Sequence, residues 1–176
     1  MSDKSFVHLH NHSEYSMLDG AARIKQLVAK AAELEMPAIA ITDHGNSHGA
    51  YEFWKQANAH GVKPVIGIEA YLAPGSRTDK TRVRWGDGGG DGGSGGGAYS
   101  HLTMWSTDNA SMQNLFRLSS EAYLSGYYFK PRMDRELLSK YGKGLIATTG
   151  CPGGEVQTRL RLGQYQEALD TASEFR

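Results

Sequence analysis

The sequence predicts an α/β fold in which strands and helices alternate along one domain or part of one. Short apolar runs typical of strands recur along the chain, at 5–9, 38–42, 64–69, 101–105 and 144–148. Segments with the apolar spacing of amphipathic helices separate most of these runs. Hydrophobic residues make up 39% of the 176 residues and charged residues 22%, which is typical of a soluble globular protein with a sizeable core.

The first half of the chain has the strand and helix order of a parallel sheet with right-handed crossovers. It predicts a strand, a turn, a helix, a second strand, a second helix and a third strand, at 5–9, 16–20, 21–35, 38–42, 48–59 and 64–69. Pro37 prevents the first helix from continuing. The uninterrupted apolar run at 38–42 is typical of a strand that is buried on both faces.

The second half begins with a break in this pattern at 73–98. Nine of the twelve residues from Gly86 to Gly97 are glycine, which predicts a flexible loop without a packed element. A glycine-rich phosphate cradle is disfavoured, because it needs a strand before it and a helix directly after it. A strand, two helices, a strand and two helical segments follow, at 101–105, 109–124, 133–141, 144–148, 154–162 and 164–176.

Charge and cysteine content limit the kinds of partner. Lysine plus arginine and aspartate plus glutamate both number 19, so the chain lacks a strongly basic nucleic-acid footprint. A neutral chain can still hold a nucleic-acid end in a metal site. The single cysteine, Cys151, excludes an internal disulfide and fits the reducing cytoplasm. No apolar run reaches membrane length, so we expect a cytoplasmic protein with no membrane partner.

Metal-ligand side chains cluster at the start of the chain. His8, His10 and His12 occupy alternate positions, and alternate side chains of an extended strand lie on the same face. Asp19 follows on the next loop. Imidazole nitrogen and carboxylate oxygen together bind zinc and related ions. This stretch therefore predicts a metal site, although a strand with polar residues on its solvent face is the alternative.

The later strands deliver further ligand types to the same predicted edge. His44 follows the second strand, Glu69 ends the third, and Cys151 follows the fifth. His101 lies at the start of the fourth strand, which does not fit a parallel sheet. Functional groups of parallel α/β folds gather beyond the carboxyl ends of the strands, so we expect these side chains to converge. A bridging carboxylate such as Glu69 would let two ions share an oxyanion, which suits phosphate-ester hydrolysis.

Each of these residues also has a purely structural interpretation. Asp19 could form a turn with Gly20, His44 could begin a helix, Glu69 could form an exposed ion pair, and Cys151 could be a small buried hydrophobe. Their joint occurrence at strand ends favours the metal site. We expect Asp43 to have a supporting role, because it would point away from His44 on a strand. The remaining histidines are interpreted as structural: His8, His48 and His60.

Three motifs resemble a known family. They are His10-Asn11-His12-Ser13 with Ser16, Asp19 and Gly20, then Ile41-Thr42-Asp43-His44-Gly45-Asn46, then Gly67-Ile68-Glu69-Ala70-Tyr71. Together they resemble the PHP (polymerase and histidinol phosphatase) domain. They are most similar to the PHP domains at the N-termini of bacterial replicative DNA polymerases, a subfamily that the run at 149–163 also fits. The resemblance covers nearly all of the chain outside the glycine-rich loop.

The resemblance implies a distorted (β/α)7-type PHP barrel, incomplete here with about five βα units. It also implies a cluster of up to three divalent ions, with zinc favoured and manganese or iron as alternatives. By resemblance, His10 and His12 would bind one ion and Glu69 would bridge it to a second. His101 and Cys151 would complete the second ion's ligands, and Asp19 and His44 would bind the third. The resemblance gives catalytic roles to Glu69, His10 and His12.

The implied activity is a metal-dependent 3′–5′ exonuclease that proofreads a DNA 3′ end. The implied partners are this DNA end and other replication subunits such as the sliding clamp. A histidinol-phosphate-type phosphatase and a non-catalytic scaffold for a polymerase are the alternatives. The Asp-x-His motif that closes the family's site does not follow Cys151. We therefore expect residues 1–176 to be the N-terminal part of a PHP domain, with the rest of the barrel and the polymerase domains absent.

Overall fold

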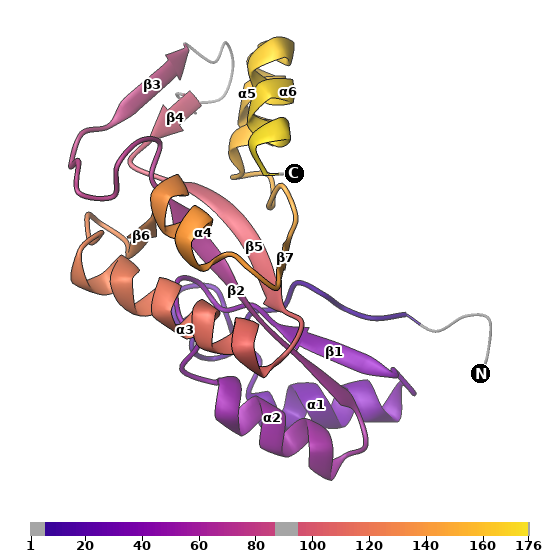
Figure 1. Cartoon of the computed structure of the whole chain (residues 1–176). Helices are drawn as coiled ribbons and strands as arrows, with labels where there is room; N and C mark the ends of the chain where they lie inside the picture. The colour runs from indigo at the N-terminus through magenta and orange to yellow at the C-terminus, as the bar shows by residue number, and fades with distance from the viewer. Residues whose placement is uncertain (1–5, 87–94, 176) are drawn as a thin grey trace.

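The computed structural model describes residues 6–86 and 95–175 of the chain. A mixed sheet with helices packed against it forms the centre of the molecule (Figure 1). Its strands follow the order β1-β2-β5-β7, with β6 paired to β2. Their bounds are β1 Ala38–Ile41, β2 Lys63–Leu72, β5 Ser100–Ser106, β6 Arg132–Met133 and β7 Leu145–Ala147. The expected α/β fold class is confirmed.

The sheet is not parallel throughout, which corrects the prediction from the strand order. β1 and β6 run parallel to β2, whereas β5 runs antiparallel to β2 and β7 antiparallel to β5. Between β2 and β5 the described chain holds no crossover helix, but a two-stranded ribbon of β3 (Val83–Gly86) and β4 (Gly95–Gly97). A parallel neighbour needs a crossover connection, so a chain that returns without one enters the sheet in the opposite direction.

The helices form within the predicted ranges. They are α1 Ile24–Glu33, α2 Ala50–Ala59, α3 Asn109–Leu124, α4 Arg135–Tyr141, α5 Glu155–Arg161 and α6 Tyr165–Glu174. Figure 1 shows α1 and α2 side by side near β1, α3 along the sheet, and α5 and α6 paired near the β3–β4 ribbon. Among the described residues, no helix is long and apolar enough to cross a membrane.

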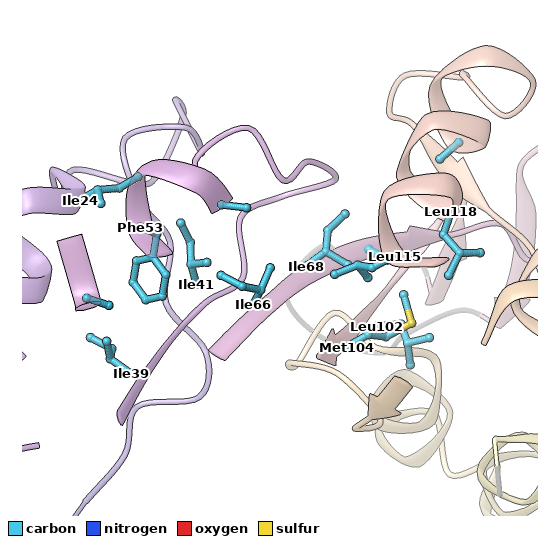
Figure 2. Close-up of a cluster of buried hydrophobic side chains, with 14 of the residues drawn as sticks. Ile24, Ile39, Ile41, Phe53, Ile66, Ile68, Leu102, Met104, Leu115 and Leu118 are labelled. Carbon is cyan, nitrogen blue, oxygen red and sulfur yellow. The ribbon is translucent and has the colours of Figure 1, made fainter. Parts of the chain in front are cut away.

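The core lies on the helix-covered face of the sheet because alternate strand residues point to that face. Figure 2 shows Ile39, Ile41 and Phe53 gathered around β1, and Leu102, Met104, Leu115 and Leu118 gathered between β5 and α3. Ile66 and Ile68 of β2 lie between the two groups. The intervening residues of β2, Gly67, Glu69 and Tyr71, therefore point to the opposite face, on which the candidate site is built.

Two local predictions are wrong. Residues 6–9 form no strand, because their contacts with β1 are isolated: the amide of Ala40 donates to the carbonyl of His8, and that of Thr42 to the carbonyl of Asn11, both at 2.9 Å. The glycine-rich run does contain paired backbone, since Gly86 and residues 95–97 belong to the β3–β4 ribbon. The rest of that predicted loop, residues 87–94, lies outside the described part of the chain.

Candidate metal centre

The carboxylate of Glu69 is the centre of the site. Its side chain is 1% exposed. Oε2 lies 2.9 Å from Nε2 of His10 and 2.6 Å from Nε2 of His12. Oε1 lies 2.7 Å from Nδ1 of His101 and accepts a hydrogen bond from Sγ of Cys151 at 3.1 Å. Three imidazoles and one thiol therefore contact a single buried carboxylate.

Glu69 lies inside β2, because strand pairing continues to Leu72. The sequence pattern predicted a position at the end of the strand. On one side, the backbone of Glu69 bonds to the segment that follows β1: its amide donates to the carbonyl of Asp43 at 3.1 Å, and its carbonyl accepts from the amide of Gly45 at 2.9 Å. On the other side it lies opposite Thr103 of β5. Strand pairing on both sides therefore fixes the backbone from which the carboxylate projects.

The antiparallel direction of β5 explains the position of His101. Register pairs His101 with Tyr71, near the carboxyl end of β2. The first residues of an antiparallel strand lie beside the last residues of its partner, so a ligand at the start of β5 reaches the same edge as ligands at the ends of β1 and β2. The apparent misfit of His101 came from the assumption of a parallel sheet.

Asp19 and His44 continue the cluster on the other side of His12. Oδ2 of Asp19 lies 2.9 Å from Nε2 of His44 and 3.3 Å from Nδ1 of His12. Nδ1 of His44 lies 3.3 Å from Oε2 of Glu69. The ring of His12 thus has one nitrogen beside Glu69 and the other beside Asp19, which joins the two carboxylates into one continuous cluster.

The structure brings together all seven side chains that the sequence indicated as ligands. Three overlapping groups each place their ligand atoms within 4.8 Å of one another: His10 with His12 and Glu69, His12 with Asp19 and His44, and His44 with Glu69 and His101. His12, His44 and Glu69 each belong to two of these groups, whereas the predicted grouping shared only Glu69 between two ions. Cys151 contacts Glu69 but belongs to none of the three groups.

Two glycines allow the loops that carry His44 and Cys151 to pack closely against the rest of the site. Gly45, directly after His44, has φ +65°, and a Cβ atom there would lie 2.9 Å from the ring of Tyr71. Gly150, directly before Cys151, has φ +91°, and its Cβ would lie 2.4 Å from the carbonyl oxygen of His101. Both positions combine a left-handed backbone with close contact, so only glycine fits without displacing a candidate ligand.

Asp43 supports the site from beneath. It is 1% exposed and points to the loop after the first histidines. Its carboxylate accepts from the amide of Ser13 at 2.6 Å, from the Ser13 hydroxyl at 2.7 Å and from the Ser16 hydroxyl at 2.7 Å. Oγ of Ser16 in turn accepts from the amide of His44 at 3.0 Å. Sequence reasoning did not assign roles to Ser13 and Ser16, although both stand in the first motif.

Another residue that sequence reasoning missed is Tyr71. Its ring stacks on that of His44, with centroids 5.8 Å apart and planes 14° from parallel. The signal was present, because Tyr71 follows Glu69 by two positions and so shares its face of the strand. The three histidines interpreted as structural lie outside the cluster: His8 packs on Phe6, His48 on Tyr15, and Nδ1 of His60 lies 2.9 Å from the carbonyl of Gln56.

The charges within the cluster stabilise one another. Burial raises the pKa of Glu69, but hydrogen bonds with His10, His101 and His12 outweigh it, so the pKa lies far below its usual range. The hydrogen bond to Glu69 raises the pKa of His12. Burial opposes the shift of His101, whose contacts with Cys151 and Glu69 raise its pKa to about 9. Without a cation, the rings of His12 and His101 therefore hold a proton more strongly than a free imidazole does.

The donor set fits a divalent cation. Imidazole nitrogen, carboxylate oxygen and thiol sulfur are the ligands of zinc and related ions. The buried side-chain atoms that lack a hydrogen-bond partner among the described residues are Nδ1 of His44, Oγ1 of Thr103, Oε1 of Gln157 and Nε of Arg159. Buried polar atoms ordinarily have partners, and His44 Nδ1 lies within the cluster beside Glu69. A cation there would supply what this nitrogen lacks and would replace the protons on the neighbouring rings.

The α/β fold, with histidines and carboxylates gathered at one edge of its mixed sheet, is that of a domain with a candidate metal site, and comparison with known proteins gives its family. The family model described as the PHP domain matches residues 8–176, and the chain belongs to this family. It is similar to proteins named DNA polymerase III subunit alpha. The identity is 58% over 180 residues with the one from Saccharopolyspora erythraea and 56% over 179 residues with the one from Mycobacterium leprae.

These matches cover 97% and 100% of this chain, which spans about 15% of the length of each relative. Among solved structures, an amidohydrolase from Chromobacterium violaceum with bound sulfate and no metal matches 66% of this chain and 32% of its own. That match has 20% sequence identity and a TM-score of 0.44.

Proposed function

We propose that this chain is the phosphoesterase part of a DNA polymerase III alpha subunit and serves as a metal-dependent 3′–5′ exonuclease that proofreads DNA 3′ ends. One observation supports this above all others. Six side chains of ligand type, from separate segments of the chain, gather around the buried carboxylate of Glu69, five in direct contact and Asp19 through His12 and His44. In this assignment the DNA end is the substrate, and other replication subunits such as the sliding clamp are partners.

The residues that would hold the ions follow from the contacts. His10, His12 and Glu69 form one set, His12, Asp19 and His44 a second, and His44, Glu69 and His101 a third, with Cys151 beside Glu69. We propose up to three divalent ions, with zinc favoured and manganese or iron as alternatives. When bound, such ions polarise the phosphoryl oxygens and stabilise the negative charge that develops during phosphodiester hydrolysis.

The chain's own residues would orient the ligands and hold the charge balance. Glu69 fixes the rings of His10, His12 and His101 at distances of 2.6 to 2.9 Å. Asp43 and its serine partners fix the loop that carries Asp19. Because ligands held by a second layer of hydrogen bonds lose little freedom when they bind, this layer prepares the site before substrate arrives. Glu69, His10 and His12 are the residues to which we assign catalytic roles.

The test is degradation of a labelled oligonucleotide with a mispaired 3′ end, measured with the full-length alpha subunit that carries this domain. Glu69→Gln keeps the side-chain size and removes the charge. We expect it to lower nucleotide release by roughly a hundredfold or more, as for the loss of a main electrostatic contributor. His60→Gln, outside the cluster, is the matched control. Primer extension should persist in both variants.

Two outcomes would replace the proposal. If the wild-type protein leaves mispaired ends intact with each candidate ion and Glu69→Gln lowers only its thermal stability, the domain is a scaffold. If it hydrolyses histidinol phosphate and not DNA, it is a small-molecule phosphatase. In both cases metal content measured on the same preparations shows whether the centre was loaded.

A further inference from the structure

A second feature lies directly beside the metal centre. A cavity of about 250 Å³ opens between the loop that carries Asp19 and the segment after α3. We call it the aromatic pocket and define it by Tyr71, Tyr123, Tyr127, Phe129 and Lys130. It shares Asp19 and His44 with the metal centre. A ligand in this pocket would therefore reach the candidate metal site without leaving the protein surface.

The pocket has exposed aromatic rings that the hydrophobic core does not use. Tyr127 is 55% exposed and Phe129 is 59% exposed. On the opposite wall, Met17 and Leu18 are 87% and 91% exposed. Single exposed apolar residues are common, but a group of them around one cavity marks a binding surface. The walls therefore offer apolar and aromatic faces to a flat ligand.

One of these rings belongs to a residue whose backbone conformation is strained. Phe129 has φ +61°, in the left-handed region that bulky residues rarely adopt. The amide of Tyr128 donates to the carbonyl of Lys130 at 3.1 Å, which closes a tight turn around Phe129. A strained residue with a half-exposed ring gains nothing for the core from its conformation. Such strain persists where the position of the side chain serves binding.

The pocket also has a cation near the metal ligands. Lys130 is the one lysine among the described residues that line the pocket, and none of those residues is an arginine. Its Nζ lies 5.5 Å from the centroid of the Tyr71 ring, and this ring stacks on His44. The ammonium therefore lies over a ring that itself contacts the candidate ligand His44. A phosphate group that enters the site would find a positive charge on this side.

We infer that the aromatic pocket binds the terminal base of a single-stranded DNA 3′ end, with Tyr127 and Phe129 as stacking faces and Lys130 beside the adjoining phosphate. The inference rests on the proposed function for the choice of DNA as substrate. Aromatic rings stack on any unpaired base, whereas paired bases do not offer free faces. The volume lies below the range of pockets for drug-sized ligands, which suits one ring system and not a duplex.

The first experiment measures binding apart from hydrolysis. The 176-residue chain is titrated, in EDTA, with a fluorescent oligonucleotide whose 3′ nucleotide either has its base or is abasic. We expect the wild-type chain to prefer the intact end and Tyr127→Ala to weaken its binding by roughly tenfold, with this preference lost. Tyr127→Phe keeps the ring and should retain the preference. Tyr165→Ala removes another exposed tyrosine, on α6, which is 69% exposed against 55% for Tyr127, and should change nothing.

Two further variants separate the parts of the pocket. Phe129→Gly removes the ring and also relieves the strained backbone, so we expect weaker binding together with an unchanged or higher unfolding midpoint. This opposite response excludes misfolding as the cause. Lys130→Gln should weaken binding to both oligonucleotides equally and reduce the slope of log affinity against log salt by about one.

The outcomes distinguish this inference from the proposed function. If mispaired ends are degraded but Tyr127→Ala changes neither binding nor KM, the pocket inference is wrong and the nuclease assignment stands. If no degradation occurs but the preference for an intact terminal base disappears in Tyr127→Ala, the pocket binds single-stranded ends and the nuclease assignment fails. Equal binding of the intact and abasic ends by the wild-type chain overturns the inference directly.

Discussion

Nδ1 of His101 and Oε1 of Glu69 lie 2.7 Å apart on neighbouring strands that run in opposite directions. The contact depends on where the antiparallel pair begins, since His101 is near the first residue of β5 and Glu69 is close to the last residues of β2. A register shift of two residues that paired His101 with Ala73 would keep the face of the sheet but separate the two side chains. The site thus depends on strand pairing as much as on the ligands themselves.

The first prediction concerns metal content. We expect the wild-type protein to retain divalent ions through mild purification, and Glu69→Gln to lose most of them, because Glu69 belongs to two of the three ligand groups. Elemental analysis by mass spectrometry checks this. His60→Gln should retain the wild-type content. An unchanged ion content in Glu69→Gln would show that the ions bind elsewhere.

The second prediction concerns the pH dependence of metal binding. Burial acts against it, but contacts with Cys151 and Glu69 raise the pKa of His101 to about 9 in the absence of an ion. The hydrogen bond to Glu69 likewise raises the pKa of His12. Because a protonated imidazole cannot bind a cation, metal affinity should rise with pH up to about that value. Zinc titration against a competing chelator at several pH values measures it.

The matched variant for this titration is His101→Gln, which keeps a neutral side chain at all these pH values. We expect a weaker affinity with a shallower pH dependence, since one of the protons that the metal must displace is missing. An equally steep dependence in this variant would contradict the assignment of His101.

The third prediction concerns stability at Asp134, which caps α4. Its carboxylate accepts from the amide of Leu137 at 3.0 Å, and from the amide and Nη1 of Arg77 at 2.8 and 3.0 Å. Burial works in the other direction, but these bonds lower the pKa of Asp134. The stabilisation is therefore present above the unfolded value of about 3.9. It is lost as pH falls through the folded value.

Asp134→Asn should lower the free energy of unfolding at neutral pH by about 1–3 kcal/mol, because a charged acceptor for three donor groups is lost. The difference from the wild type should shrink in acid. Urea unfolding at neutral pH and near pH 3 measures both. Glu136→Gln removes the second and exposed carboxylate partner of Arg77 and should have little effect. A constant difference at both pH values would contradict the role of the charge.

The fourth prediction compares two glycines with similar backbones. Gly150 has φ +91° and no room for a Cβ atom beside the carbonyl of His101, whereas Gly163 has φ +73° and nothing within 4 Å. Gly163→Ala should cost only about 1–2 kcal/mol of backbone strain. Gly150→Ala should cost more and should also displace the loop of Cys151. Thermal unfolding and metal content, measured on both variants, separate the two effects.

Local patterns predicted the helices and most strands because periodicity and propensity act over short stretches. The helix at 109–124 forms with the predicted bounds, and its start is set by Asp108, which accepts from the amide of Ser111 at 2.7 Å. The strand at 5–9 failed because pairing depends on a neighbour, and that segment makes only isolated bonds to β1. The predicted direction of β5 was wrong, and the described part of the connection before it, residues 73–86 and 95–99, contains no helix.

The candidate ligands could be predicted because functional groups of α/β folds gather beside strand ends, and the structure brings these side chains together. Metal binding itself stays a prediction. Sequence reasoning could not find the way in which His12 is shared between Glu69 and Asp19, or the packing of Tyr71 on His44, because both depend on distances between segments far apart in the chain. The aromatic pocket was missed for the same reason, since Tyr127 and Phe129 carry no motif.

His12 contacts both Glu69 and Asp19, and this arrangement bears on the order in which candidate ligands can be lost during evolution. Asp19 lies at the half-exposed edge and belongs to one ligand group, so its loss would leave the groups around Glu69 in place. Loss of Glu69 would disable two groups at once and leave four imidazoles, those of His10, His12, His44 and His101, without their common partner. Relatives that lose the activity but keep the fold should therefore lose Asp19 before Glu69. A relative that retains Glu69 is expected to keep the central ligand groups as well.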